Sequence, residues 1–251
     1  MQSLAIWDIK MPAIFPMLPY EAIHKRVVSS SRCSDDFKRE QFNGSWRAIA
    51  QRFRSNWQHS EKFTRITKQF AFKPLDSEHQ YAQERELFGF FVSSLAAFES
   101  FCYSLYVIGS FLDATIFKFV DSSKPNDLRN ITPKTTLAAY AAFFQANNIS
   151  TSGSIVDELK KVIDKPPQPQ TPYQELEEVR NILIHRIIPT RINVVKFTEN
   201  LYLGTSTTEQ ASLWVNGIPL DKQTTRSRQK WLAVTLKSCL EAAEAFTRNS
   251  F

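Results

Sequence analysis

The sequence predicts a mainly α-helical protein with a small β-hairpin-like insertion. Its 251 residues include only 6 glycines but 20 phenylalanines, which favours long elements and few tight turns. Hydrophobic residues make up 43% of the chain, enough to bury a substantial core and to exclude a mainly disordered chain. Many of them recur at three- and four-residue intervals, the period of an α-helix.

Residues 1–80 are expected to form a basic N-terminal extension, because they hold 13 Lys and Arg against 8 Asp and Glu. Residues 1–36 contain several prolines and are predicted to be irregular. One amphipathic helix is predicted over residues 37–59. Its apolar positions are Phe42, Trp46, Ile49, Ala50, Phe53 and Trp57.

The helical domain is expected over residues 81–251, and its centre is the stretch Tyr81–Val120. This stretch lacks proline and is apolar around most of its circumference, so it predicts one central helix or a helix pair broken near Gly109. The apolar part from Leu87 to Leu112 is long enough to cross a membrane. Glu99 lies in its middle, however, and an unpartnered acid there is costly, so we expect a buried core helix and no membrane.

Three further helices are predicted from their N-terminal signals. Thr132-Pro133 and Ser154 precede the first two, and Thr171-Pro172 with Gln174 precedes the third. Between the second and the third of these helices, residues 165–171 are predicted to form an exposed Pro- and Gln-rich linker. The third helix is predicted to end by Ile188, because Pro189 follows it.

The pattern changes to alternation in the insertion, at about residues 190–221. Asn216-Gly217 is a dipeptide preferred in hairpin turns, and Pro219 would confine its strand to the edge of a sheet. A last amphipathic helix is predicted over residues 225–246.

The three cysteines, at positions 33, 102 and 239, are too far apart in sequence to indicate a disulfide framework or a zinc site. We therefore expect a protein of a reducing compartment, the cytoplasm, without an export signal. The four histidines are scattered, and no nucleotide-binding loop or serine-hydrolase motif is present. The sequence thus predicts neither a metal nor a cofactor.

One short motif points to chemistry: Arg180 is followed by Asn181 and, five positions after the arginine, by His185. The spacing alone is uninformative, because Arg54 and His59 share it. The Arg180 copy differs in two ways: a polar Asn follows the arginine, and the motif lies near the end of a capped helix. The motif resembles the signature of the HEPN superfamily, and residues 81–248 resemble its architecture. Members are helical bundles, and many are metal-independent ribonucleases that act as toxins, in phage defence or in RNA processing.

The resemblance implies a homodimer whose subunits place Arg180 and His185 across a shared cleft. RNA cleavage by the ribose 2′-oxygen needs a group that titrates near neutrality, which His185 would supply, and a fixed cation for the phosphorane, which Arg180 would supply. Asn181 would assist, and Glu99 is a further candidate lying against the arginine. Five helical positions span about 140° of rotation, so the two side chains do not share one narrow stripe.

Each of these residues also has a purely structural interpretation. Arg180 would pair with Glu177, Glu178 or Gln174, and His185 would favour a helix C-terminus as a cation. Asn181 would be a surface residue, and Glu99 would belong to a structural ion pair.

Basic and aromatic residues alternate between Trp46 and Phe72, a combination suited to single-stranded RNA. The candidate contacts are Arg47, Arg52, Arg54 and Trp57; in the alternative, the aromatic side chains face the core and the basic ones face water. We therefore expect a metal-independent endoribonuclease that binds RNA, with an antitoxin or activating protein as a further partner. The alternative function is a non-catalytic helical module that binds RNA or protein.

Overall fold

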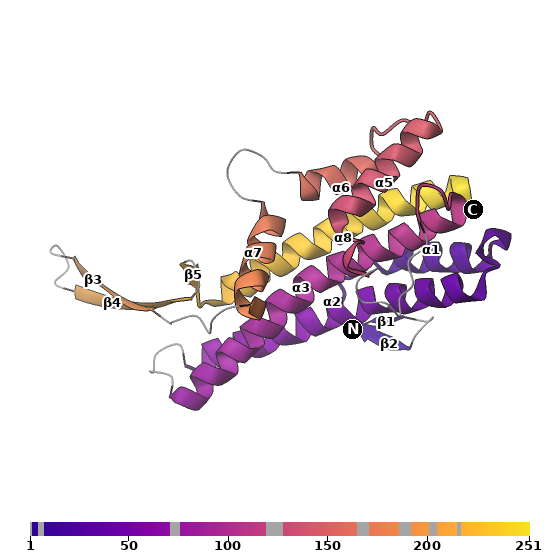
Figure 1. The fold of residues 1–251 in the computed structure, drawn as a ribbon. Coiled ribbons are helices and arrows are strands. Elements are labelled where there is room, and N and C mark those ends of the chain that lie inside the picture. The colour runs from indigo at the N-terminus through magenta and orange to yellow at the C-terminus, as the bar shows by residue number, and fades with distance from the viewer. Residues whose placement is uncertain are drawn as a thin grey trace.

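Two long helices, α2 (Asp36–Gln69) and α3 (Ser77–Leu112), lie side by side through the molecule (Figure 1). They run antiparallel, as contacts from Ser45 to Ser104 at one end and from Gln83 to Thr67 at the other require. This is a computed structural model, and it describes residues 2–4, 8–70, 76–118, 128–164, 171–185, 192–200, 205–214 and 217–251.

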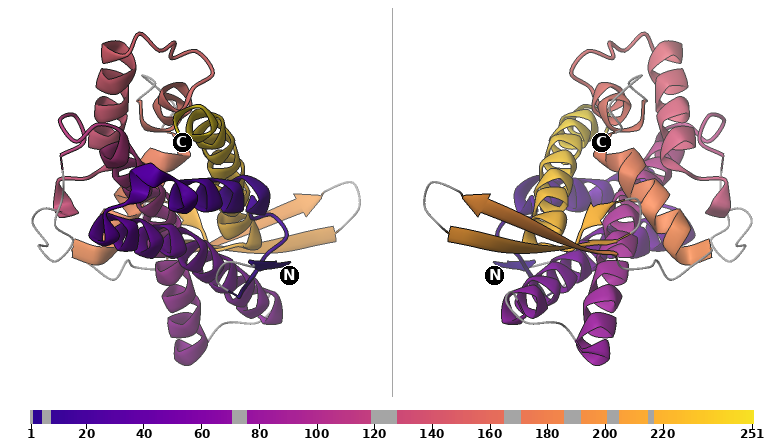
Figure 2. Two further views of the ribbon diagram at one scale, coloured as in Figure 1. Left: turned by 90° about the vertical axis from the view of Figure 1, so that its right-hand side faces the viewer. Right: turned by 90° about the vertical axis from the view of Figure 1, so that its left-hand side faces the viewer.

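The remaining helices surround this pair (Figures 1 and 2). Helix α8 lies along α1, α2, α3 and α6, while α7 and α5 pack on α3. Their bounds are α1 Met17–Ser29, α5 Pro133–Ala146, α6 Ile155–Ile163, α7 Pro172–His185 and α8 Lys222–Ser250, with a 3₁₀ turn at Ser31–Cys33. The mainly helical fold predicted from the sequence is confirmed.

Two small antiparallel sheets complete the described chain. Strands β1 (Gln2–Leu4) and β2 (Ile9–Met11) form one, and β3 (Ile192–Asn200), β4 (Thr205–Trp214) and β5 (Ile218–Pro219) form the other in that order. Most of the β3–β4 hairpin extends away from the helices (Figure 1). Pro219 lies in the edge strand β5, opposite Leu213 of β4. An edge position suits a proline, because it has no N–H to donate to a further strand. Gly217 has a φ of 78°, as a tight turn needs; Asn216 lies outside the described residues.

The predicted N-terminal signals are present at all three helices. The Thr132 hydroxyl accepts from the Thr135 N–H at the start of α5, and Ser154 caps α6. At α7, the Gln174 side chain accepts from the Thr171 N–H while the Thr171 hydroxyl accepts from the Gln174 N–H. These bonds satisfy N–H groups that have no partner within the helix.

The prediction that residues 1–36 are irregular is wrong, because α1 occupies 13 of them. Pro16 directly precedes the helix, and Pro19 lies in its first turn. A missing N–H costs nothing at either position, because the first N–H groups of a helix have no partner within it. Tyr20 fixes α1 on α2: its hydroxyl donates to the Trp46 carbonyl at 2.6 Å, and the two rings stack at 5.0 Å.

Two helix ends differ from the prediction. Helix α2 continues ten residues beyond His59, and Phe63 and Thr64 in this extension are buried. Helix α3 passes through Gly109 unbroken and ends at Leu112. The chain then turns back, so that the Phe117 ring occupies the space beside Gly109 where a side chain would be.

Residue 80 does not separate two cores. The larger apolar cluster joins Phe42, Trp46 and Phe53 of α2 to Phe98 and Leu105 of α3, and the smaller one joins Phe63 to residues of α3 and α7. Helices α1 and α2 therefore share their apolar cores with the helices that follow residue 80.

Among the described helices, α3 alone is long and apolar enough to span a membrane by length and composition, and 72% of its apolar window is buried inside the fold. All three cysteines are buried and free.

Replacing Gly109 with alanine should destabilise the protein, although alanine is normally the better helix former. A Cβ there would lie 2.4 Å from the buried Phe117 ring, so we expect a loss of about 1–3 kcal/mol in the free energy of unfolding. Gly44→Ala in α2 is the matched control, because nothing lies within 4 Å of its Cβ position. It should stabilise by about 0.5–1 kcal/mol. Urea denaturation of both variants tests this, and equal effects would contradict the packing of Phe117 on Gly109.

Candidate functional site

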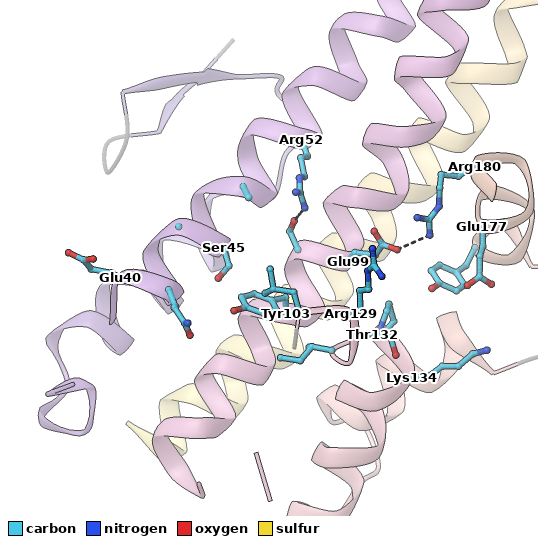
Figure 3. A pocket seen from close by; sticks show the side chains of 18 of the residues that line it. Glu40, Ser45, Arg52, Glu99, Tyr103, Arg129, Thr132, Lys134, Glu177 and Arg180 are labelled. Carbon is cyan, nitrogen blue, oxygen red and sulfur yellow. Dashed lines mark hydrogen bonds and ion pairs between the residues drawn. The ribbon is translucent and has the colours of Figure 1, made fainter. Parts of the chain in front are cut away.

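A cleft of about 970 Å³ opens between α2, α3, α7 and the start of α5 (Figure 3). Among the described residues, its lining includes four cationic side chains and three carboxylates. They are Arg52, Arg129, Lys134 and Arg180, and Glu40, Glu99 and Glu177. Aromatic side chains of Phe37, Tyr103 and Tyr173 complete its walls.

Arg180 and Glu99 meet in this cleft, although 81 residues separate them in the sequence. The Arg180 Nη2 donates to the Glu99 Oε1 at 3.0 Å, which forms an ion pair across the space between α7 and α3 (Figure 3). The arginine thus contacts a different helix rather than the carboxylates of its own helix.

Helix α7 presents Arg180 to the cleft because of its apolar face. Tyr173, Leu176 and Val179 are buried, and the Tyr173 ring packs edge-on against Phe98 of α3. Arg180 directly follows Val179, at the border of this face, where its side chain keeps 24% of its surface exposed. Its Nε is buried and has no hydrogen-bond partner among the described residues.

Glu99 lies on the half-exposed stripe of α3. Between residues 92 and 106, the partly exposed side chains are Val92, Ala96, Glu99, Tyr103 and Tyr106, at intervals of four and three residues. Burial raises the pKa of Glu99 above its ordinary value, and Arg180 and Arg52 oppose that shift. The carboxyl group is therefore easier to protonate than one in water.

Arg52 of α2 is anchored one turn away. Its Nη1 donates to the Ala96 carbonyl at 3.1 Å and also to the Ser100 hydroxyl. The guanidinium is thus held against α3, beside Glu99, in the wall of the cleft.

The structure brings together some of the residues that the sequence singled out. Arg180, Glu99 and Arg52 share the cleft, whereas Asn181 is exposed and does not line it. His185 is the last residue of α7, and its side chain lies outside the described part of the structure. The predicted role of His185 therefore stays a prediction.

The four candidate RNA contacts of α2 do not form one surface. Arg52 lines the cleft, and Trp57 lines a separate groove between α8 and the segment before α1. Arg47 and Arg54 line neither. Seven residues apart, they lie on the same side of α2, roughly 140–160° around the helix from Arg52.

Sequence reasoning missed Arg129 and Lys134. Arg129 belongs to the segment before α5, and Lys134 directly follows the N-terminal proline of α5; both are exposed where they line the cleft. Their own sequence neighbourhood carries no sign of this, because the folding of α5 onto α3 creates the cleft. Tyr103 was detectable only as one more aromatic residue in an apolar helix.

The histidine of the second Arg–His pair, His59, belongs to a different cluster. His59 Nδ1 lies 2.7 Å from Glu86 Oε2, and Arg85 pairs with the other oxygen of that carboxylate at 2.8 Å. Burial alone would raise the pKa of Glu86, but the hydrogen bonds from His59 and Arg85 outweigh it, so the pKa is lowered. This cluster joins α2 to α3.

Replacing Glu86 with Gln should therefore destabilise the protein in a pH-dependent way. Because the folded-state pKa is below the unfolded one, the contribution is present above the ordinary glutamate pKa and is lost as the pH falls. We expect a loss of about 1–3 kcal/mol near neutral pH that shrinks towards about pH 4. Chemical denaturation of wild type and variant across this range measures it; a difference that grows on acidification would contradict the assignment.

The described residues contain no group of three or more His, Cys, Asp or Glu side chains that could hold a metal ion. No family model, no curated protein and no solved structure matches the chain. The chemistry has to be argued from the cleft itself.

Proposed function

We propose that the protein is a metal-independent endoribonuclease of the HEPN type, which cleaves RNA by attack of a ribose 2′-oxygen. The observation that carries this proposal is the position of Arg180. It is the arginine of the motif, and it lies in a cleft that also holds Arg52, Arg129 and Lys134.

The cleft residues suit a phosphodiester. A guanidinium offers two parallel donors to phosphate oxygens and keeps its charge at any physiological pH. Arg180 would stabilise the negative charge that develops on the phosphorane, and the other cations would hold neighbouring phosphates. Tyr103 and Tyr173 add aromatic surface in the same walls, although Tyr173 is itself almost fully buried.

His185 would transfer the proton, and Asn181 would assist from the same helix. Because helical geometry separates Arg180 and His185 by about 140°, a complete site is easier to assemble across two subunits than within one. We therefore propose a homodimer that acts in the cytoplasm. An antitoxin or activating protein, and a role as a toxin or in phage defence, belong to the same proposal.

RNA cleavage by the purified protein in the presence of EDTA tests the activity. We expect Arg180→Ala to lose about 10²–10³-fold and His185→Ala about 10²–10⁴-fold in rate, because each removes one part of the transition-state stabilisation. Arg65→Ala and His79→Ala are matched controls, since Arg65 is exposed, His79 is partly exposed, and both lie outside the cleft. Both controls should cleave like wild type.

Unchanged cleavage in the Arg180 and His185 variants would reject these sites. RNA binding without cleavage by the wild type would favour the alternative, a non-catalytic binding module.

Mixing the two inactive variants tests the shared cleft. If each site takes Arg180 from one subunit and His185 from the other, Arg180→Ala and His185→Ala subunits should regain up to about a quarter of wild-type activity once they exchange partners. Size-exclusion chromatography with light scattering gives the oligomeric state. A monomer that cleaves RNA at full rate would contradict the dimer.

A further inference from the structure

The guanidinium of Arg180, which the proposed ribonuclease would need for its substrate, is already paired with the Glu99 carboxylate. In the free protein, the Arg180 Nη2 is bonded to the Glu99 carboxylate at 3.0 Å. Both side chains line the cleft, with 24% and 36% of their surfaces exposed, so an anion that enters meets a cation already paired.

The charged surroundings of Glu99 come from several elements. Arg52 of α2 and Arg180 of α7 favour its ionised form, while Glu177 of α7 disfavours it. Glu40, Arg129 and Lys134 line the same cleft. Burial raises the pKa values of the neighbouring Tyr173, Tyr103 and Cys102, so these groups keep their protons near neutral pH.

A phosphate that binds Arg180 changes this balance. It takes over donors that now stabilise the carboxylate and places a second negative charge beside it. Two anions that share one guanidinium repel each other, and the half-buried position of Glu99 limits the relief that water can give. Protonation of Glu99 removes the repulsion.

We propose that Glu99 is a proton-linked gate: a phosphate that binds Arg180 displaces the Glu99 carboxylate, which takes up one proton from solvent. This inference rests on the proposed function, in which Arg180 binds the phosphate of RNA. The only covalent bond that forms is the O–H bond of the Glu99 carboxyl group. The phosphodiester keeps its single negative charge.

The direction of the pH dependence follows from linkage. Burial already raises the pKa of Glu99 in the free protein, and loss of Arg180 together with the added anion raises it further. Between the free and bound pKa values, binding takes up a proton, so the affinity for the anion rises as the pH falls through that window. Above both values there is no uptake.

Isothermal titration calorimetry with a single-stranded thymidine deoxyoligonucleotide tests the gate. This probe lacks the 2′-hydroxyl and is not cleaved by the proposed mechanism, and its phosphodiesters do not titrate between about pH 5 and pH 8. Titrations in buffers of different ionisation enthalpy give the number of protons taken up. We expect uptake of up to one proton per site, largest towards the acidic end of the range.

Three variants identify the group. Glu99→Gln should take up no proton and should bind about tenfold more tightly than wild type near pH 8, because the competing carboxylate is gone. Glu40→Gln removes the same charge from an exposed carboxylate in the cleft and should keep the uptake. His185→Asn should also keep the uptake, which separates Glu99 from the imidazole of the proposed catalytic site.

The gate is overturned if wild type binds without proton uptake, if Glu99→Gln keeps the wild-type uptake or binds more weakly, or if wild type does not bind the probe at all. The wild-type measurement stands even if Glu99→Gln fails to fold. Cleavage of RNA without proton-linked binding would leave the proposed function intact and remove the gate. Proton-linked binding without cleavage would support the gate and reject the proposed ribonuclease activity.

Discussion

Helix α3 is apolar around most of its circumference, and most of its side chains between Leu87 and Ser110 are buried. Helices α2, α5, α7 and α8 pack on it (Figure 2). Removing each large apolar side chain from water contributes roughly 1.5–3 kcal/mol, so a helix with this many must be covered.

Polar contacts fix the register of α2 against α3 within this apolar arrangement. The fully buried Asn56 donates to the Phe90 carbonyl at 3.2 Å, and the Ser104 hydroxyl lies 2.9 Å from that of Ser45. The His59–Glu86 pair makes a third contact. Because a buried polar group without a partner is costly, a helical slip of either helix would be opposed at each of these positions.

The cleft forms where the cover of α3 is incomplete. Its half-exposed stripe has a spacing of four and three residues and carries Glu99 and Tyr103 at its centre. The Glu99–Arg180 ion pair bridges α3 and α7 at this point with part of both side chains exposed. The proposed gate would give this pair a role in binding.

Local sequence signals determined the helix starts. Thr132, Ser154 and Thr171 cap helices through bonds to residues two or three positions away, so no tertiary contact is needed to predict them. The apolar period likewise predicted α2 and α8, because it reflects one face turned towards a core, whereas apolar residues on most of its circumference predicted α3. The motif around Arg180 was visible for the same local reason.

Only the tertiary structure decided where these elements meet. Helix α1 was not predicted, because proline is a helix breaker except near a helix start, and the end of α3 depends on Phe117 folding back onto Gly109. The pairing of Arg180 with Glu99, and the addition of Arg129 and Lys134 to the same cleft, join residues of three separate segments. The sequence by itself specified helices and their apolar faces through interactions within a few residues; the packing of those faces, which depends on the whole chain, decided which polar groups share a cleft.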